Sequence, residues 1–140
     1  MTTDPMTVED FLEVMAANAE VYTEFAALPD EQKRLMANGN IATGTAETFR
    51  EDGKIVGVGG IRHIGIGESW FITPPAIRKK PLKLLRQVRK SLEQIRTDKQ
   101  LWRIFAASKI SENFLKHLGF AKNEDFHVWT IDGRPNGYQR

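Results

Sequence analysis

Apolar residues in the first forty positions follow a helical repeat. They recur at steps of three and four residues: Val8, Phe11, Leu12, Met15, Ala19, Tyr22 and Ala26. This spacing predicts a helix over residues 7–27, which Thr7 can cap because its hydroxyl can accept a backbone N–H of the first turn. A second, shorter helix is predicted over residues 28–39, with Gly39 at its end.

The apolar pattern changes to alternation near residue 42. Residues 42–51 alternate and are rich in β-branched side chains, and Asp52-Gly53 is a typical hairpin turn. We therefore predict strands over residues 42–51, 54–64 and 68–73. Five glycines interrupt the alternation: Gly57, Gly59, Gly60, Gly65 and Gly67. Glycines inside strands mark bulges or places where another segment approaches the backbone closely.

Helices and strands alternate in the C-terminal half. Pro74 and Pro75 end the third strand, and Pro81 suits the first position of a helix, where its missing N–H is not needed. The other predicted elements are a helix over residues 82–97, a strand over 101–106, a helix over 109–118 that Gly119 ends, and a strand over 126–131.

This order of elements predicts an α/β fold, with a mixed sheet flanked by helices. We expect one domain over residues 1–140, with N-terminal helices within 1–40 and a loose tail over 132–140. The helical pattern starts early, so the sheet's first strand is expected to be very short or missing. An open sheet edge of that kind favours self-association.

Composition excludes several classes of function. The chain has no cysteine, which excludes a disulfide framework and thiolate chemistry and suits a reducing compartment. It also has no apolar run of 18 residues and no basic, apolar leader at its N-terminus. We therefore expect a cytoplasmic protein without a membrane partner.

Charge is distributed unevenly along the chain. Residues 1–70 hold 5 Lys/Arg and 12 Asp/Glu, whereas residues 71–140 hold 15 and 6. Two interpretations remain open at this stage. Either the basic half faces an anion, or the two halves neutralise each other within one fold.

The densest block of cations is AIRKKPLKLLRQVRK, residues 76–90. It follows a predicted strand and continues into a predicted helix, and the free N–H groups of a helix N-terminus bind phosphate. Cations there oppose the positive end of the helix dipole unless an anion is bound. The alternative is a solvated basic face on an amphipathic helix.

Other sites are not supported by the sequence. In GVGGIRHIGIG the G-x-G-x-x-G spacing of a dinucleotide loop fails and no helix follows, so a bulged strand is the better interpretation. His63, His117 and His127 lie in separate elements without metal-ligand spacing, and we predict no metal site. No G-x-S-x-G nucleophile motif is present.

Three segments together carry a resemblance to a known family: DGKIVGVGGI, ESWFITPPAIRKKPLKLLRQV and LWRIFAASKISENFLKHLGF. Their order and spacing resemble the GNAT superfamily of acyl-CoA-dependent N-acetyltransferases, over residues 42–122. The chain is also similar to small acetyltransferase-like proteins of tailed bacteriophages, some of them associated with virion assembly. The resemblance implies a splayed sheet that holds acetyl-CoA, and a host bacterial cytoplasm if the protein is phage-encoded.

The resemblance also implies roles for particular residues. The phosphates of CoA would be held by the loop that opens the central helix: Arg78, Lys79, Lys80, Pro81, Leu82 and Lys83. Ser108 stands where the family usually has an asparagine that opens the last helix. Glu68, near the start of the central strand, is the candidate general base.

Two departures from the family pattern weaken this assignment. Pro81 and Lys83 replace the two small residues of the phosphate loop; proline removes an amide donor, and lysine adds bulk along with a cation. Leu115 stands where the family often has a tyrosine that protonates the leaving thiolate.

Three functions therefore remain open. The first is transfer of an acetyl group from acetyl-CoA to an unknown amine or protein, with positioning supplying much of the catalysis. The second is a non-catalytic GNAT-fold module, such as a phage accessory or virion-assembly protein that binds a phage protein partner. The third is nucleic-acid binding through the basic helix.

Overall fold

The computed structural model describes residues 1–64, 66–75, 81–107, 110–123 and 128–134. The described chain holds seven strands and five helices. In chain order they are β1 (Thr2–Pro5), α1 (Val8–Ala17), α2 (Thr23–Ala26), α3 (Asp30–Ala42), β2 (Gly44–Glu51), β3 (Lys54–Ile64), β4 (Ile66–Ile72), α4 (Pro81–Lys99), β5 (Arg103–Ala106), α5 (Glu112–Leu118), β6 (Ala121–Asn123) and β7 (Val128–Asp132). None of these described helices has both the length and the apolarity needed to cross a membrane.

All seven strands form one mixed sheet, in the order β1-β2-β3-β4-β5-β7-β6. Every neighbouring pair is antiparallel except β4 and β5, which are parallel and joined through α4. The expected α/β fold with a mixed sheet is thus confirmed.

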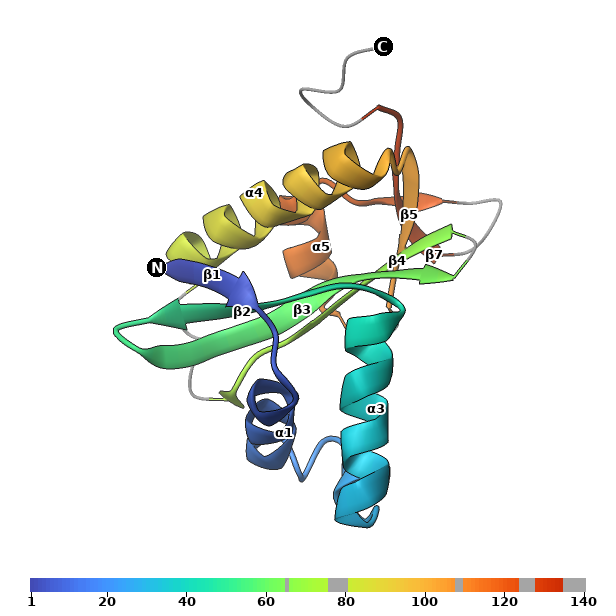
Figure 1. Cartoon of the computed structure of the whole chain (residues 1–140). Helices are drawn as coiled ribbons and strands as arrows, with labels where there is room; N and C mark the ends of the chain where they lie inside the picture. The colour runs from blue at the N-terminus through green and yellow to red at the C-terminus, as the bar shows by residue number, and fades with distance from the viewer. Residues whose placement is uncertain (65, 76–80, 108–109, 124–127, 135–140) are drawn as a thin grey trace.

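Helices cover both faces of the sheet, and each layer has its own core (Figure 1). On one face, α1 and α3 pack over a cluster that includes Phe11, Val58 and Trp70. On the other face, α4 and α5 pack over a larger cluster that includes Ile61 and Ile104. Of the apolar residues that predict α4, four are buried and Leu85 is half-buried; the buried ones are Leu84, Val88, Leu92 and Ile95.

The predicted helix over residues 7–27 is wrong, because two helices occupy this segment. α1 ends at Asn18, whose buried side chain donates to the carbonyl of Val14 and, across the fold, to that of Thr73. This tertiary hydrogen bond overrides the helical repeat of the apolar residues, and α2 then forms a single turn. The predicted cap at Thr7 is confirmed, because its hydroxyl accepts from the N–H of Asp10 at 3.1 Å.

The second predicted helix also ends later than expected. α3 continues through Gly39 to Ala42, because Thr43 caps its C-terminus. The N–H and the hydroxyl of Thr43 both donate to the carbonyl of Gly39. At the other end of the chain, Gly119 does end α5, in the left-handed conformation with φ of 98°.

The two edge strands are short. β1 has four residues and pairs with β2, so the first strand of the sheet is present but very short, which is one of the two expectations. β6 has three residues and was not predicted, since three residues are too few to show alternation. Self-association through an edge stays a prediction.

The remaining differences concern the C-terminal third. α5 begins after Ser111, whose hydroxyl accepts from the N–H of Phe114 at 3.2 Å, so its described start is later than the predicted residue 109. β7 extends through Asp132 into the predicted tail. The rest of that tail, from residue 135, lies outside the described residues, as does the predicted strand start at 126.

The uneven charge of the sequence becomes a difference between the two sides of the sheet. Residues 1–43, which include α1 to α3, hold 2 Lys/Arg and 8 Asp/Glu, whereas α4 on the opposite face holds 6 and 2. Of the eight ion pairs between described residues, only Lys83–Glu51 joins the acidic half to the basic half. Among the described residues, the two halves are therefore joined by a single ion pair and are not neutralised by direct pairing.

Candidate functional site

The parallel strands β4 and β5 pair over only three residues and then part. Gly67–Ser69 lie beside Ile104–Ala106, and the N–H of Ala107 donates to the carbonyl of Ser69 at 2.9 Å. The Ser69 hydroxyl adds a bond to the carbonyl of Phe105 at 3.2 Å. β4 continues to Ile72 while β5 ends, so the sheet opens at this point.

The edge of β4 beyond Ser69 presents backbone groups to this opening. Backbone groups alternate sides along a strand, so Phe71 and Thr73 direct their N–H and C=O toward the same side as Ser69. The carbonyl of Thr73 accepts the side-chain amide of Asn18 at 3.0 Å, which ties α1 to the end of β4. An extended ligand could pair with such an edge in the way an added strand does.

Three aromatic rings line the side of the opening toward α4 and α5. The ring of Phe71 stacks on Phe114 of α5, with centroids 5.2 Å apart and an interplanar angle of 16°. Phe49 of β2 meets Phe71 edge-on at 5.7 Å. Such contacts fix the ring in one orientation.

Two glycines of β3 make room for the Phe71 ring. A Cβ on Gly57 would lie 2.6 Å from its Cζ, and a Cβ on Gly59 would lie 2.5 Å from its Cδ2. β3 also carries a bulge, because the pairing with β2 shifts between Phe49 and Arg50. The glycine-rich segment is thus a bulged strand under an aromatic ring, which confirms the prediction against a dinucleotide loop.

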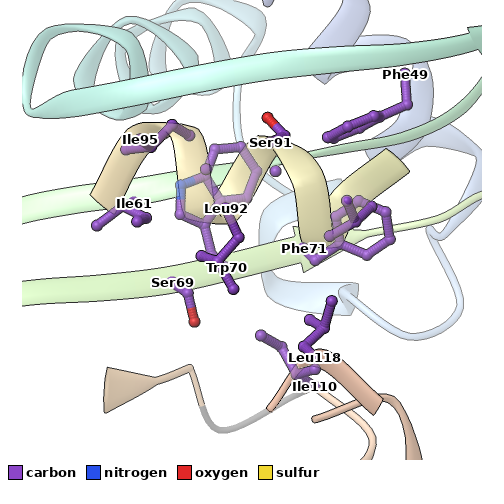
Figure 2. A pocket seen from close by; sticks show the side chains of 13 residues that line it. Phe49, Ile61, Ser69, Trp70, Phe71, Ser91, Leu92, Ile95, Ile110 and Leu118 are labelled. Carbon is purple, nitrogen blue, oxygen red and sulfur yellow. The ribbon is translucent and has the colours of Figure 1, made fainter. Parts of the chain in front are cut away.

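A small apolar pocket lies under α4 where the strands part. Its volume is about 30 Å³. In Figure 2, Phe49 and Phe71 close one side, Ile110 and Leu118 lie below, and Leu92 and Ile95 of α4 lie across it. A water molecule occupies about 10–15 Å³ by this measure, so the pocket has room for a group of two or three heavy atoms.

The candidate base Glu68 lies on the opposite face of β4, toward α3. Its Oε1 accepts from Arg62 at 2.7 Å, and its side chain is 45% exposed. Arg62 in turn donates to Asn40 of α3 at 3.0 Å and lies over the ring of Trp70 at 5.3 Å. The carboxylate is therefore held in place by an arginine, with its second oxygen free of any hydrogen bond between described residues.

Sequence reasoning missed the residues around Glu68. Arg62 and Glu68 face each other in the ladder between β3 and β4, so counting along a predicted hairpin could have paired them. The Nε1 of Trp70, two residues further along β4, is buried without a partner in the described part of the chain. Nothing in the sequence distinguished this tryptophan from an ordinary core residue.

The predicted phosphate loop is described only in part. α4 begins at Pro81, as predicted; Leu82 is 65% exposed, and Lys83 donates to Glu51 at 3.1 Å. The other residues assigned to the cofactor, Arg78, Lys79, Lys80 and Ser108, lie outside the described residues, and their roles stay predictions.

Leu115 packs into the core rather than facing the opening. It is 2% exposed and belongs to the cluster beneath α4. It therefore offers no proton and no access to a leaving group at this position.

The histidines do not form a metal site in the described structure. His117 lies on the exposed side of α5 with Nδ1 2.7 Å from the carbonyl of Asn113. His63 lies on β3 with its Nε2 buried and unpartnered among described residues, and His127 lies outside them. No cluster of three His, Asp or Glu side chains within the described ranges could hold a metal ion.

His63 is expected to make stability depend on pH. Burial lowers the pKa of His63 from its ordinary 6.5, and the charge of Lys99 lowers it further. Below pH 6.5 the imidazole of His63 is protonated in the unfolded chain but still neutral in the folded chain. The contribution of His63 to the free energy of unfolding is therefore full above pH 6.5 and is lost as the pH falls toward the lowered pKa of the folded state. We expect Tm to fall between pH 7.5 and 5.5, and His63→Gln to remove part of that fall; parallel curves for the two proteins would contradict the prediction.

Comparisons with known proteins identify the fold. No protein-family model and no curated protein matches the sequence. Among solved structures, a chimeric spermidine N-acetyltransferase SpeG from Vibrio cholerae and hSSAT superposes with a TM-score of 0.71 at 15% identity, covering 99% of this chain and 98% of that one.

Two further structures agree with this assignment. YncA from Salmonella typhimurium, described as an acetyltransferase and solved with its cofactor acetyl-CoA, gives a TM-score of 0.69 at 13% identity over 94% of this chain and 92% of its own. A GNAT-family acetyltransferase from Bacillus anthracis gives 0.63 at 14% identity over 91% and 89%. The chain thus has the GNAT fold, and at these identities the likeness extends to the fold alone.

Proposed function

We propose that the protein binds acetyl-CoA in the opening between β4 and β5 and transfers the acetyl group to an amine. The observation that carries this proposal is the parting of two parallel strands beneath α4. The free strand edge can hold an extended chain, and the helix N-terminus can hold phosphates at its end. The same fold in yncA was solved with acetyl-CoA.

The small pocket fits this proposal in size and polarity. At about 30 Å³ it accommodates an acetyl group but not a long acyl chain. Its lining side chains are almost all apolar, and Ser69 and Ser91 are the hydroxyl-bearing exceptions. The amine would approach from the other face of β4, where α1 and α3 form an acidic layer.

Acid–base chemistry in this proposal depends on Glu68. The amine nitrogen attacks the thioester carbon, and the C–S bond breaks to release the CoA thiolate. The amine proton passes to the free oxygen of Glu68 directly or through water, and the thiolate takes a proton from solvent. Arg62 orients the carboxylate through its 2.7 Å bond. Arg78, Lys79, Lys80 and Lys83 are proposed to attract the phosphates of CoA.

A non-catalytic role is the second candidate, and two observations favour it. Phe71, on one side of the opening, is held by stacking on Phe114, and Leu115 gives no acid for the leaving thiolate. A GNAT-fold accessory or assembly protein, including one of a phage, needs neither an accessible acyl site nor a proton donor for a thiolate. This candidate predicts binding without turnover, or no binding at all.

Glu68→Gln separates the two candidates. In the enzyme, acetyl-CoA raises the stability of both wild type and variant, by about 2.7 kcal/mol at a hundredfold excess over Kd. Turnover by the variant falls by a factor of about 10² to 10⁴, because only proton transfer is lost. The measurements are thermal shift, and release of CoA thiol with spermidine as the amine probe.

Glu13→Gln is the matched control, since Glu13 is an exposed carboxylate of α1 on the same side of the sheet. It should leave both the shift and the turnover unchanged. A thermal shift without thiol release, in wild type as in the variant, would favour the binding module. Absence of any shift at millimolar acetyl-CoA would exclude the enzyme.

A further inference from the structure

The solvent-facing side of α4 carries further cations beyond Lys83, the one cation of this helix that the proposed function assigns to the phosphates of CoA. Over the first three turns the exposed positions are Leu82, Lys83, Arg86, Arg89 and Lys90. No acidic residue occurs anywhere between Ala76 and Leu92. We call Lys83, Arg86, Arg89 and Lys90 the basic face.

These cations have little compensation within the protein. Arg86, Arg89 and Lys90 form no ion pair with any residue that the structure describes. Among the same residues Lys83 pairs with Glu51 alone, and its own side chain is 73% exposed. Lys83 and Arg89 lie three residues from Arg86, and Lys90 lies four, so like charges face each other along the helix. In the free protein, no acidic side chain of a described residue pairs with Arg86, Arg89 or Lys90 to offset this repulsion.

Three of the four cations of the basic face lie beyond the first turn of the helix. A helix rises 1.5 Å per residue, so Arg86 to Lys90 lie roughly 8–14 Å along the axis from Pro81. An anion held by the first-turn N–H groups would not reach them. The basic face therefore needs a second, longer anion.

We propose that the basic face of α4 binds the phosphate backbone of a nucleic-acid duplex. Lys83, Arg86 and the neighbouring pair Arg89 and Lys90 follow one another at steps of about 4–6 Å along the helix axis, a spacing comparable to that of phosphates along a strand. Protein interfaces are built on aromatic and apolar anchors and are poor in lysine, whereas the only large apolar side chain exposed on these turns is Leu82. Binding through phosphates alone is independent of sequence.

Fluorescence anisotropy of the full chain with a labelled 20-bp DNA duplex tests this proposal. Four phosphate contacts predict a slope of log K against log salt of about −3.6, or roughly 150-fold weaker binding at 200 mM than at 50 mM salt. Reversing three cations together, Arg86→Glu, Arg89→Glu and Lys90→Glu, should weaken binding at least tenfold and bring the slope near −0.9, the value for one contact.

A matched control reverses three exposed lysines elsewhere, with Lys54→Glu, Lys116→Glu and Lys122→Glu. It changes net charge by the same amount and should weaken binding by less than about threefold, since long-range attraction falls off within a Debye length of 10 Å. An equal loss in both variants would overturn the proposal, as would a salt-independent signal.

Two further measurements exclude other partners and simple unfolding. If poly-glutamate competes as well as duplex does, the surface binds an acidic protein and the proposal is overturned. The proposal is also overturned if light scattering shows self-association that is lost in the basic-face variant. The neutral variant with Arg86→Gln, Arg89→Gln and Lys90→Gln should lose duplex binding without a fall in Tm, because it removes repulsion. The thermal shift that acetyl-CoA produces is measured on the same variant. A failure of duplex binding can then be distinguished from a failure of the proposed function.

Discussion

Replacing Gly59 with alanine should lower the free energy of unfolding by about 2–3 kcal/mol and Tm by about 6–9 °C. The new Cβ would lie 2.5 Å from Cδ2 of Phe71 and 2.6 Å from the carbonyl oxygen of Trp70. The ring cannot retreat freely because Phe114 stacks on it, and the carbonyl belongs to the neighbouring strand. Overpacking against backbone is costly because no rotamer change relieves it.

Gly39→Ala provides the control for this substitution. Gly39 lies inside α3 and has no heavy atom within 4 Å of an added Cβ. Alanine there should raise stability by about 0.5–1 kcal/mol, since it reduces the entropy of the unfolded chain and favours helix. Thermal unfolding of both variants measures the difference, and a Gly59→Ala protein as stable as wild type would show that Phe71 is free to move.

Leu115→Tyr should destabilise the protein by about 3 kcal/mol and leave acetyl transfer no faster. Leu115 is 2% exposed within the core beneath α4, so a phenol ring overpacks that core and buries a hydroxyl without a prepared partner. The position corresponds to the family's acid in sequence, but the side chain of this chain points into the core. Thermal unfolding and thiol release on the same sample provide the measurements.

Leu115→Met is the volume-conserving comparison and should cost less than about 1.5 kcal/mol. The two variants together distinguish a loss of packing from a gain of chemistry. A tyrosine variant that stays folded and releases CoA thiol faster than wild type would place residue 115 at the opening and contradict this assignment.

Local sequence signals predicted most of the sheet and the long helix. Asp52 and Gly53 form the hairpin turn with φ of 52° and 78°, the pair of positive values that this dipeptide favours. Pro81 begins α4 and Gly119 ends α5, as their backbone preferences require. The boundary after α1 could not be predicted, because Asn18 ends the helix through a bond to Thr73, 55 residues away.

The candidate site was harder to predict than the fold, because its contacts depend on strand register. Glu68 was identified from its position, but its partner Arg62 is apparent only once β3 and β4 are aligned. Phe71 was not singled out at all. Its position over Gly57 and Gly59 could have been suspected from an aromatic residue facing alternate glycines on a neighbouring strand.

The single parallel joint in the sheet has a mechanical consequence. The sheet consists of two antiparallel ribbons, β1-β2-β3-β4 and β5-β7-β6. Among the described residues, only the short ladder between Gly67–Ser69 and Ile104–Ala106 joins them within the sheet. The Ser69 hydrogen bonds and the overlying α4 reinforce this ladder. Within each ribbon the strands are held by their hairpin partners, so opening fluctuations concentrate at this seam. The sheet thus consists of two ribbons joined by a short ladder, and a ligand bound between them would restrict their movement relative to each other.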